Sequence, residues 1–172
     1  MRTKLFNLKS IILAVTIGII FTSCTKDSDP AKDILGTWTV ESVSFSAMVG
    51  TQSLFDYLID EVGLSQAQAQ AMIDLFGLEM QQEFTGTIEM KSDNTYTADL
   101  GGEDDSGTWS LISDNTKLVI DSDYDDPMTL DILEITSSKL RVQGDYFIEE
   151  DLDDDEIAET ITITIDLNFR KL

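Results

Sequence analysis

The chain has 172 residues, with 33 acidic and 11 basic side chains, a net charge of −22, no His and one Cys. Without His there is no Ser-His or Cys-His nucleophile pair and no imidazole ligand for zinc, and the charge repels nucleic acids and anionic lipid headgroups. The length predicts one domain, and a hydrophobic content of 42% is enough for a folded core.

Residues 1–23 are unlike the rest of the chain. Basic residues precede an apolar run over 11–21, and the segment has no acidic residue, which is typical of a secretory signal peptide. The run is shorter than the roughly 20 residues with which a helix crosses a bilayer. The sequence FTSC at 21–24 resembles a bacterial lipobox, which implies that Cys24 becomes a lipidated N-terminus. The alternative is an ordinary cleaved signal followed by a chance Cys.

Residues 24–33 are polar, contain Pro30 and predict a flexible tether. An acidic run directly after a lipidated Cys resembles the surface-export signal of Bacteroidota lipoproteins. We therefore expect an outer-membrane lipoprotein, attached to the membrane through the lipid on Cys24. The sequence leaves open whether the domain faces the periplasm or the cell exterior.

Residues 34–172 show an alternation of apolar and polar positions that predicts strands with one buried face. The alternation is clearest over 160–170. Eight such segments, separated by short turn signals, predict a mainly β domain: an eight-stranded, up-and-down antiparallel barrel without exposed edges. Besides Ile161, Ile163, Ile165, Leu167 and Phe169, the apolar positions are Trp38/Val40, Phe84/Ile88/Met90, Tyr96/Ala98/Leu100, Trp109/Leu111, Leu118/Ile120, Met128/Leu130/Ile132 and Leu140/Val142/Tyr146/Ile148.

Residues 52–82 break this pattern, because their apolar residues are three and four positions apart. Gly63 is expected to end a first helix, and Ser65 to cap a second one. We predict a two-helix insertion between the first and second strands. Its apolar side is expected to cover the open end or the flank of the barrel.

Two short motifs support a family resemblance. The sequence GTW at 36–38 resembles the Gly-x-Trp signature of lipocalins, and GTWSL at 107–111 resembles an element of lipocalin-like lipoproteins of Bacteroidota. The insertion is similar to the lid of fatty-acid-binding proteins. The resemblance covers 34–172 and implies a calycin-type barrel able to hold a small apolar ligand. A TDY-type element of classical lipocalins has no counterpart, so a retinol-carrier or pheromone-carrier role is unsupported.

Aromatic side chains on the predicted inner face are candidates for contact with such a ligand. An eight-stranded barrel has an interior that side chains either fill or leave open for one small ligand. The sequence leaves both alternatives open, and packing is the usual role of a buried Trp. The candidates are Trp38, Tyr96, Trp109, Tyr146 and Phe169.

Acidic residues are dense in three predicted connections. In an up-and-down barrel alternate connections share one end, which places 101–105, 121–126 and 149–156 together, opposite the tether. Carboxylates on loops suit a divalent cation such as calcium, although an EF-hand starting at Asp121 fails at Asp126 and Ile132. The alternative is a solvated acidic surface. The candidates are Asp104, Asp105, Asp121, Asp123, Asp125, Asp153, Asp154 and Asp155.

The expected function is binding without catalysis. Nothing in the sequence marks two carboxylates as a buried pair facing a substrate, as glycoside hydrolysis requires, so we expect neither an enzyme nor a resident cofactor. The leading hypothesis is a small or hydrophobic ligand bound in the barrel beneath the helical insertion. The alternatives are a surface module whose acidic loop end binds a partner protein or a divalent cation, and a filled barrel with a structural role in the envelope.

Overall fold

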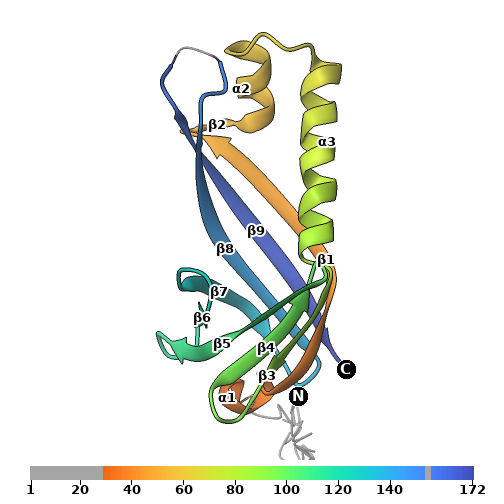
Figure 1. Cartoon of the computed structure of the whole chain (residues 1–172), viewed down its shortest axis with the longest axis vertical. Coiled ribbons are helices and arrows are strands. Elements are labelled where there is room, and N and C mark those ends of the chain that lie inside the picture. The colour runs from red at the N-terminus through yellow and green to blue at the C-terminus, as the bar shows by residue number, and fades with distance from the viewer. Residues whose placement is uncertain (1–28, 154–155) are drawn as a thin grey trace, which may run out of the picture.

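The computed structural model describes residues 29–153 and 156–172 (Figure 1). The expected signal peptide, the lipidation site Cys24, and Asp154 and Asp155 therefore lie outside the described residues. The strands are β1 (Gly36–Val49), β2 (Gln52–Ser53), β3 (Gly86–Met90), β4 (Thr95–Leu100), β5 (Glu103–Ile112), β6 (Lys117–Ser122), β7 (Met128–Ile135), β8 (Lys139–Glu150) and β9 (Glu159–Lys171). The helices are α1 (Pro30–Asp33), α2 (Leu54–Asp60) and α3 (Gln66–Glu83).

The strands form a closed, eight-stranded, up-and-down antiparallel barrel. Strands β3 to β9 pair with their neighbours in chain order, and β1 closes the barrel by pairing with both β3 and β9. The short β2 adds to the far end of β1. The predicted fold class is confirmed. Among the described helices, none is long and apolar enough to cross a bilayer.

The barrel is closed only over part of its length. Strand β1 pairs with β3 over Gly36–Thr39 but with β9 up to Val49, and β7 pairs with β8 only as far as Gln143. Beyond these points β8, β9 and β1 continue as a three-stranded extension that rises above the barrel (Figure 1). A register shift between Val40 and Ser42 marks where β1 leaves the barrel. The extension is therefore one wall without an opposite strand.

The predicted helical insertion lies over this extension (Figure 1). The Ser53 hydroxyl caps α2 by accepting the Asp56 N–H, and Ser65 forms a capping box with Gln68 at the start of α3. Helix α2 ends at Asp60 and not at Gly63 as predicted. The insertion itself is confirmed, because strong local caps and a three- to four-residue apolar spacing define both helices.

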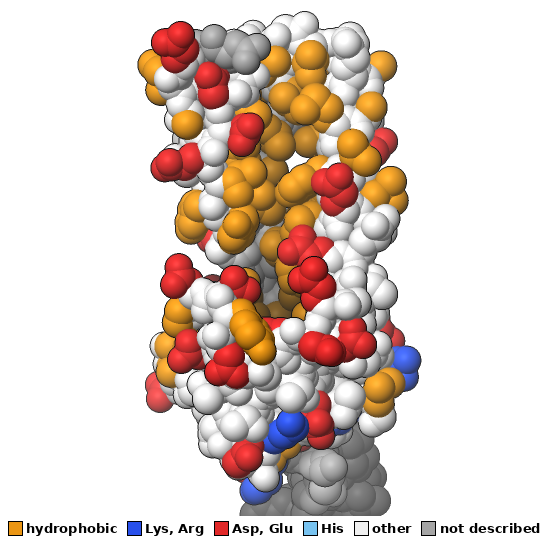
Figure 2. Space-filling model, viewed as in Figure 1, with side chains coloured by type: hydrophobic (Ala, Val, Ile, Leu, Met, Phe, Trp, Pro, Cys, Tyr) orange, Lys and Arg blue, Asp and Glu red, His pale blue; other side chains and the backbone are white. Residues whose placement is uncertain are grey.

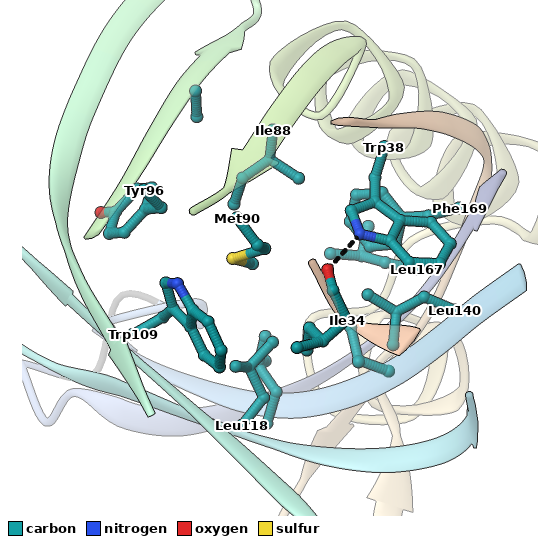
Figure 3. Close-up of a cluster of buried hydrophobic side chains, with 13 residues drawn as sticks. Ile34, Trp38, Ile88, Met90, Tyr96, Trp109, Leu118, Leu140, Leu167 and Phe169 are labelled. Atoms are coloured by element: carbon teal, nitrogen blue, oxygen red, sulfur yellow. Dashed lines mark hydrogen bonds between the residues drawn. The ribbon is translucent and has the colours of Figure 1, made fainter. Parts of the chain in front are cut away.

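The lower barrel is filled by one hydrophobic cluster (Figure 3). Trp38 is fully buried, and its indole Nε1 donates a hydrogen bond to the Ile34 carbonyl at 2.7 Å. The helical turn of α1 brings Ile34 into this position, so the last four residues of the predicted tether are ordered against the barrel. The indole Nε1 of Trp109 on β5 donates a hydrogen bond to the carbonyl of Lys91, which follows β3, at 3.1 Å.

The connections follow the predicted parity but not the predicted lengths. The turns after β3, β5 and β7 lie at the tether end, as expected. The connection after β4 is only Gly101-Gly102, because Glu103–Asp105 belong to β5, and Asp121 belongs to β6. The β8–β9 connection lies at the tip of the extension, beside α2, and the β6–β7 connection lies lower, at the barrel (Figure 1). The predicted single acidic end is therefore divided between two levels.

Candidate binding groove

An apolar groove separates the helical insertion from the extension. Its volume is about 210 Å³, and it opens to solvent on one side. In Figure 2 hydrophobic side chains line a hollow that runs along the upper part of the molecule. Among the described residues, Glu150 is the one charged side chain of the lining; the other lining residues are Leu54, Leu58, Met72, Ile73, Phe76, Ile148, Leu152, Ile161 and Ile163.

The strand wall of the groove continues the inner face of the barrel. Ile161 and Ile163 of β9 are both 3% exposed, and Ile148 of β8 pairs with Ile161, so the three side chains share one face. Since β7 stops below this level, the two helices are the elements that cover this face. Their cover is partial, which leaves apolar surface facing a space and not another layer.

Two aromatic side chains join α3 to the strand wall. The rings of Phe45 on β1 and Phe76 on α3 meet edge to face, with centroids 5.0 Å apart. Gly77 follows directly, and a Cβ at this position would lie 3.0 Å from the Phe45 ring. Helix α3 therefore approaches β1 closely at this point, which fixes one side of the groove.

Exposed apolar side chains border the groove. On α3, the lining residue Met72 is 49% exposed. On β8, Tyr146 is 54% exposed, although it pairs with the buried Ile163 and so lies on the same inner face. The prediction that Tyr146 points into a closed barrel is wrong, because the pairing of β8 with β7 ends at Gln143, and beyond this point β8 pairs only with β9. Apolar surface of this kind often marks a binding region.

The other four predicted ligand-lining aromatics lie together below the groove. Trp38, Tyr96, Trp109 and Phe169 are at most 7% exposed and belong to one packed cluster with aliphatic residues (Figure 3). Their side chains fill the barrel interior, so these four aromatics pack the core and do not line an open ligand site. A site beneath the helical insertion therefore lies above the barrel core and between other residues than those predicted.

Asp105 is part of a polar network at the mouth of the barrel. Tyr96 donates from its hydroxyl to Asp105 Oδ2 at 2.6 Å, and Ser122 donates to Oδ1 at 2.8 Å. Burial, followed by the hydrogen bond to this carboxylate, raises the pKa of Tyr96 well above its usual range. The prediction that Asp105 lies in a loop is wrong, because it belongs to β5. Its two carboxylate oxygens accept hydrogen bonds from side chains of the neighbouring strands β4 and β6.

The other described acidic candidates do not gather at one place. Asp104, Asp121, Asp123 and Asp125 are exposed near the barrel, and the Asp123 carboxylate accepts a hydrogen bond from Ser106 at 2.8 Å. Asp153 lies at the tip of the extension. The predicted barrel placed Asp153 at the same end as these four residues, whereas in the structure Asp153 lies apart from them.

At the tip, Asp153 is close to two acidic residues that were not predicted as site residues. Ligand oxygens of Asp151, Asp153 and Glu159 all lie within 4.8 Å of one another. Glu159 also hydrogen-bonds Tyr57 of α2, whose pKa is raised to about 12, first by desolvation and then by this bond. Asp151 and Asp153 lie in the predicted connection over 149–156, whereas Glu159 begins β9, and the pairing of Glu150 with Glu159 across the hairpin brings it beside them.

Comparisons with known proteins give little beyond the structure itself. No family model and no curated protein matches the chain. Among solved structures, the chain is similar to a DUF4847 family protein from Bacteroides vulgatus ATCC 8482, at 14% identity, covering 75% of this chain and 92% of that chain, with a TM-score of 0.38. The barrel assignment rests on the strand pairing described above.

Proposed function

We propose that this protein is a lipid-anchored, lipocalin-like binding protein of the cell envelope, without enzymatic activity, whose groove holds a small hydrophobic ligand. The observation that carries the proposal is the groove itself: nine apolar side chains of the described part of the chain surround about 210 Å³ between the insertion and the extension. Binding sites for small molecules are mostly apolar and concave. The membrane anchor would be the lipid on Cys24, and the membrane would be the outer membrane.

The size of the groove favours a slender ligand. Its volume of about 210 Å³ is below the roughly 300 Å³ at which pockets for drug-sized molecules begin. The hollow is open along one side, where Met72 and Tyr146 present further apolar surface. A single alkyl chain lying along the groove fits this shape better than a bulky ring system, and burying each CH₂ contributes about 0.8 kcal/mol.

The experiment is a titration of the purified protein with the slender, neutral, apolar dye 1,6-diphenylhexatriene in detergent-free buffer, followed by displacement with decanol. Met72→Gln places an amide in the groove lining and is expected to weaken dye binding several-fold. Leu133→Gln is the matched control, because Leu133 is 46% exposed on β7 and is not a lining residue, compared with 49% for Met72. Saturable binding that decanol cannot reverse, or an equal loss in both variants, contradicts the proposal.

The second candidate is binding of a divalent cation or a partner protein by the acidic residues at the tip of the extension. It is favoured by the convergence of Asp151, Asp153 and Glu159 within 4.8 Å, since calcium takes several carboxylate oxygens. A calorimetric calcium titration, repeated on Glu159→Gln and on the control Asp125→Asn, tests the cation. The candidate fails if millimolar calcium gives neither heat nor a shift in the thermal melt.

A further inference from the structure

Positive charge is confined to one end of the described molecule. Lysine and arginine side chains occur beside the tether, next to the three tight turns and at the end of β9. Figure 2 shows them only at the lower end, on the face in view. These residues are Lys32, Lys91, Lys117, Lys139, Arg141, Arg170 and Lys171.

The elements that build the groove contain no positive charge. Residues 33–90 include α2, α3 and all of β1, and residues 142–169 include most of β8 and β9; neither segment has a Lys or Arg. The five ion pairs of the described residues all use cations from the tether end, such as Arg141 with Asp166. A ligand in the groove therefore meets no lysine or arginine from these elements.

Negative charge gathers at the rim of the same groove. Glu150 belongs to the lining. Glu159 pairs with Glu150 across β8 and β9, and its carboxylate accepts a hydrogen bond from the backbone N–H of the lining residue Leu152 at 2.8 Å. Carboxylate oxygens of Asp151 and Asp153 lie within 4.8 Å of it. Carboxylates beside an apolar wall create a local negative potential, which raises the local concentration of cations and lowers that of anions.

We infer that the groove selects cationic amphiphiles: molecules with one alkyl chain and an ammonium-type head group, the chain lying between α3 and β9 and the head beside Glu150. The inference rests on the proposed function of the groove as an apolar binding site. The negative charge of the rim favours a cationic head group. A carboxylate head group at this place would face Glu150 and the acidic tip without a compensating cation. Fatty acids are thus disfavoured, and neutral alcohols are intermediate.

The test compares three probes with the same ten-carbon chain: decyltrimethylammonium, decanol and decanoate. Each is titrated calorimetrically into the purified protein below its micellar concentration, in 20 mM and in 1 M NaCl. At low salt the ammonium probe is expected to bind about fivefold more tightly than decanol, and decanoate about fivefold more weakly, which is the size of one solvent-exposed charge interaction. In 1 M NaCl the three affinities are expected to converge, because the Debye length falls to about 3 Å.

Two variants locate the effect. Glu150→Gln is expected to lower affinity for the ammonium probe about threefold and to leave decanol unchanged. Asp125→Asn removes the same charge from an exposed position outside the groove lining and is expected to change neither. This pair separates a local contact from the overall negative charge of the protein.

The outcomes distinguish this inference from the proposed function. Equal affinity for the three probes at low salt overturns the cationic preference but leaves the groove as an apolar site. The same holds if Glu150→Gln and Asp125→Asn reduce binding of the ammonium probe equally, since the head group then has no defined place at the rim. If none of the probes binds, the proposed function falls and this inference with it.

Discussion

The ammonium of Lys171 lies 4.8 Å from the centroid of the Trp38 ring. Lys171 and Trp38 also pair in register across β9 and β1. The same ammonium donates a hydrogen bond to the Asp33 carbonyl at 2.7 Å. Desolvation lowers the pKa of Lys171, which shows that its charge is drawn partly out of water. One side chain thus joins α1, the first barrel strand and the last one.

Replacing Lys171 by Met is expected to lower the free energy of unfolding by about 1–2 kcal/mol. The substitution removes a cation–π contact and one hydrogen bond but keeps an unbranched apolar chain over the indole. Lys139→Met is the matched control, because Lys139 is an exposed lysine at the same end of the barrel. Urea unfolding followed by Trp fluorescence measures both, and equal losses in the two variants contradict the interpretation.

Arg141→Met is expected to cost about 2 kcal/mol, because it leaves a charged Asp166 without its main partner. Asp166 is only 8% exposed, and its Oδ1 accepts from Arg141 Nε at 2.9 Å. In the control, Arg170→Met breaks a pair with Glu41 whose side chains are 55% and 47% exposed, and a loss of at most about 1 kcal/mol is expected. If Arg141→Met and Arg170→Met lower the urea midpoint equally, the burial of Asp166 does not explain the loss of stability.

Stability is expected to fall as pH rises above about 10. Tyr57 keeps its proton up to a pKa of about 12 in the folded protein, whereas an unfolded tyrosine loses it near 10. Between these values the unfolded chain binds fewer protons, so ionisation stabilises the unfolded state. Tyr57→Phe removes this contribution, and its urea midpoint is expected to decline less between pH 9.5 and 11.5 than that of the wild type. Parallel declines overturn the pKa assignment.

Gly107→Ala is expected to destabilise the barrel by about 2–4 kcal/mol. A Cβ at this position would lie 2.1 Å from the backbone oxygen of Asp121, so β5 and β6 would have to separate. Gly102→Ala is the control: its backbone has φ +84° but no atom lies within 4 Å of an added Cβ, and about 1–2 kcal/mol of backbone strain is expected. Thermal melts that rank the two variants in the opposite order contradict the steric explanation.

Much of the fold could be predicted because its signals are local. The alternation from Ile161 to Phe169 predicts β9, and Ser65 followed by Gln68 predicts the start of α3. Strand β1 is longer than predicted, although Val43, Phe45 and Ala47 continue to alternate with polar residues. The register shift between Val40 and Ser42 interrupts the period, which conceals the second half of the strand.

The groove could not be predicted because it depends on where strands stop pairing. Tyr146 has the alternation of a buried strand residue, and it is exposed because the pairing of β7 with β8 ends at Gln143. Asp105 illustrates the opposite error. Its acidic neighbours indicate a loop, but the turn needs only Gly101 and Gly102, so its carboxylate enters the network with Tyr96. Pairing lengths are set by contacts distant in the chain, which a single sequence does not contain.

The pairing of β1 with β9 also brings together residues that are distant in the chain. Glu41 and Arg170, which form an ion pair across these strands, are 129 positions apart in the chain. Closing so large a loop costs entropy before the contact forms, and folding slows as contacts become less local. The groove depends on this distant pairing, because Ile161 and Ile163 of its lining belong to β9, which pairs with β1 on one side and β8 on the other. The binding site therefore requires the same long-range closure that completes the barrel.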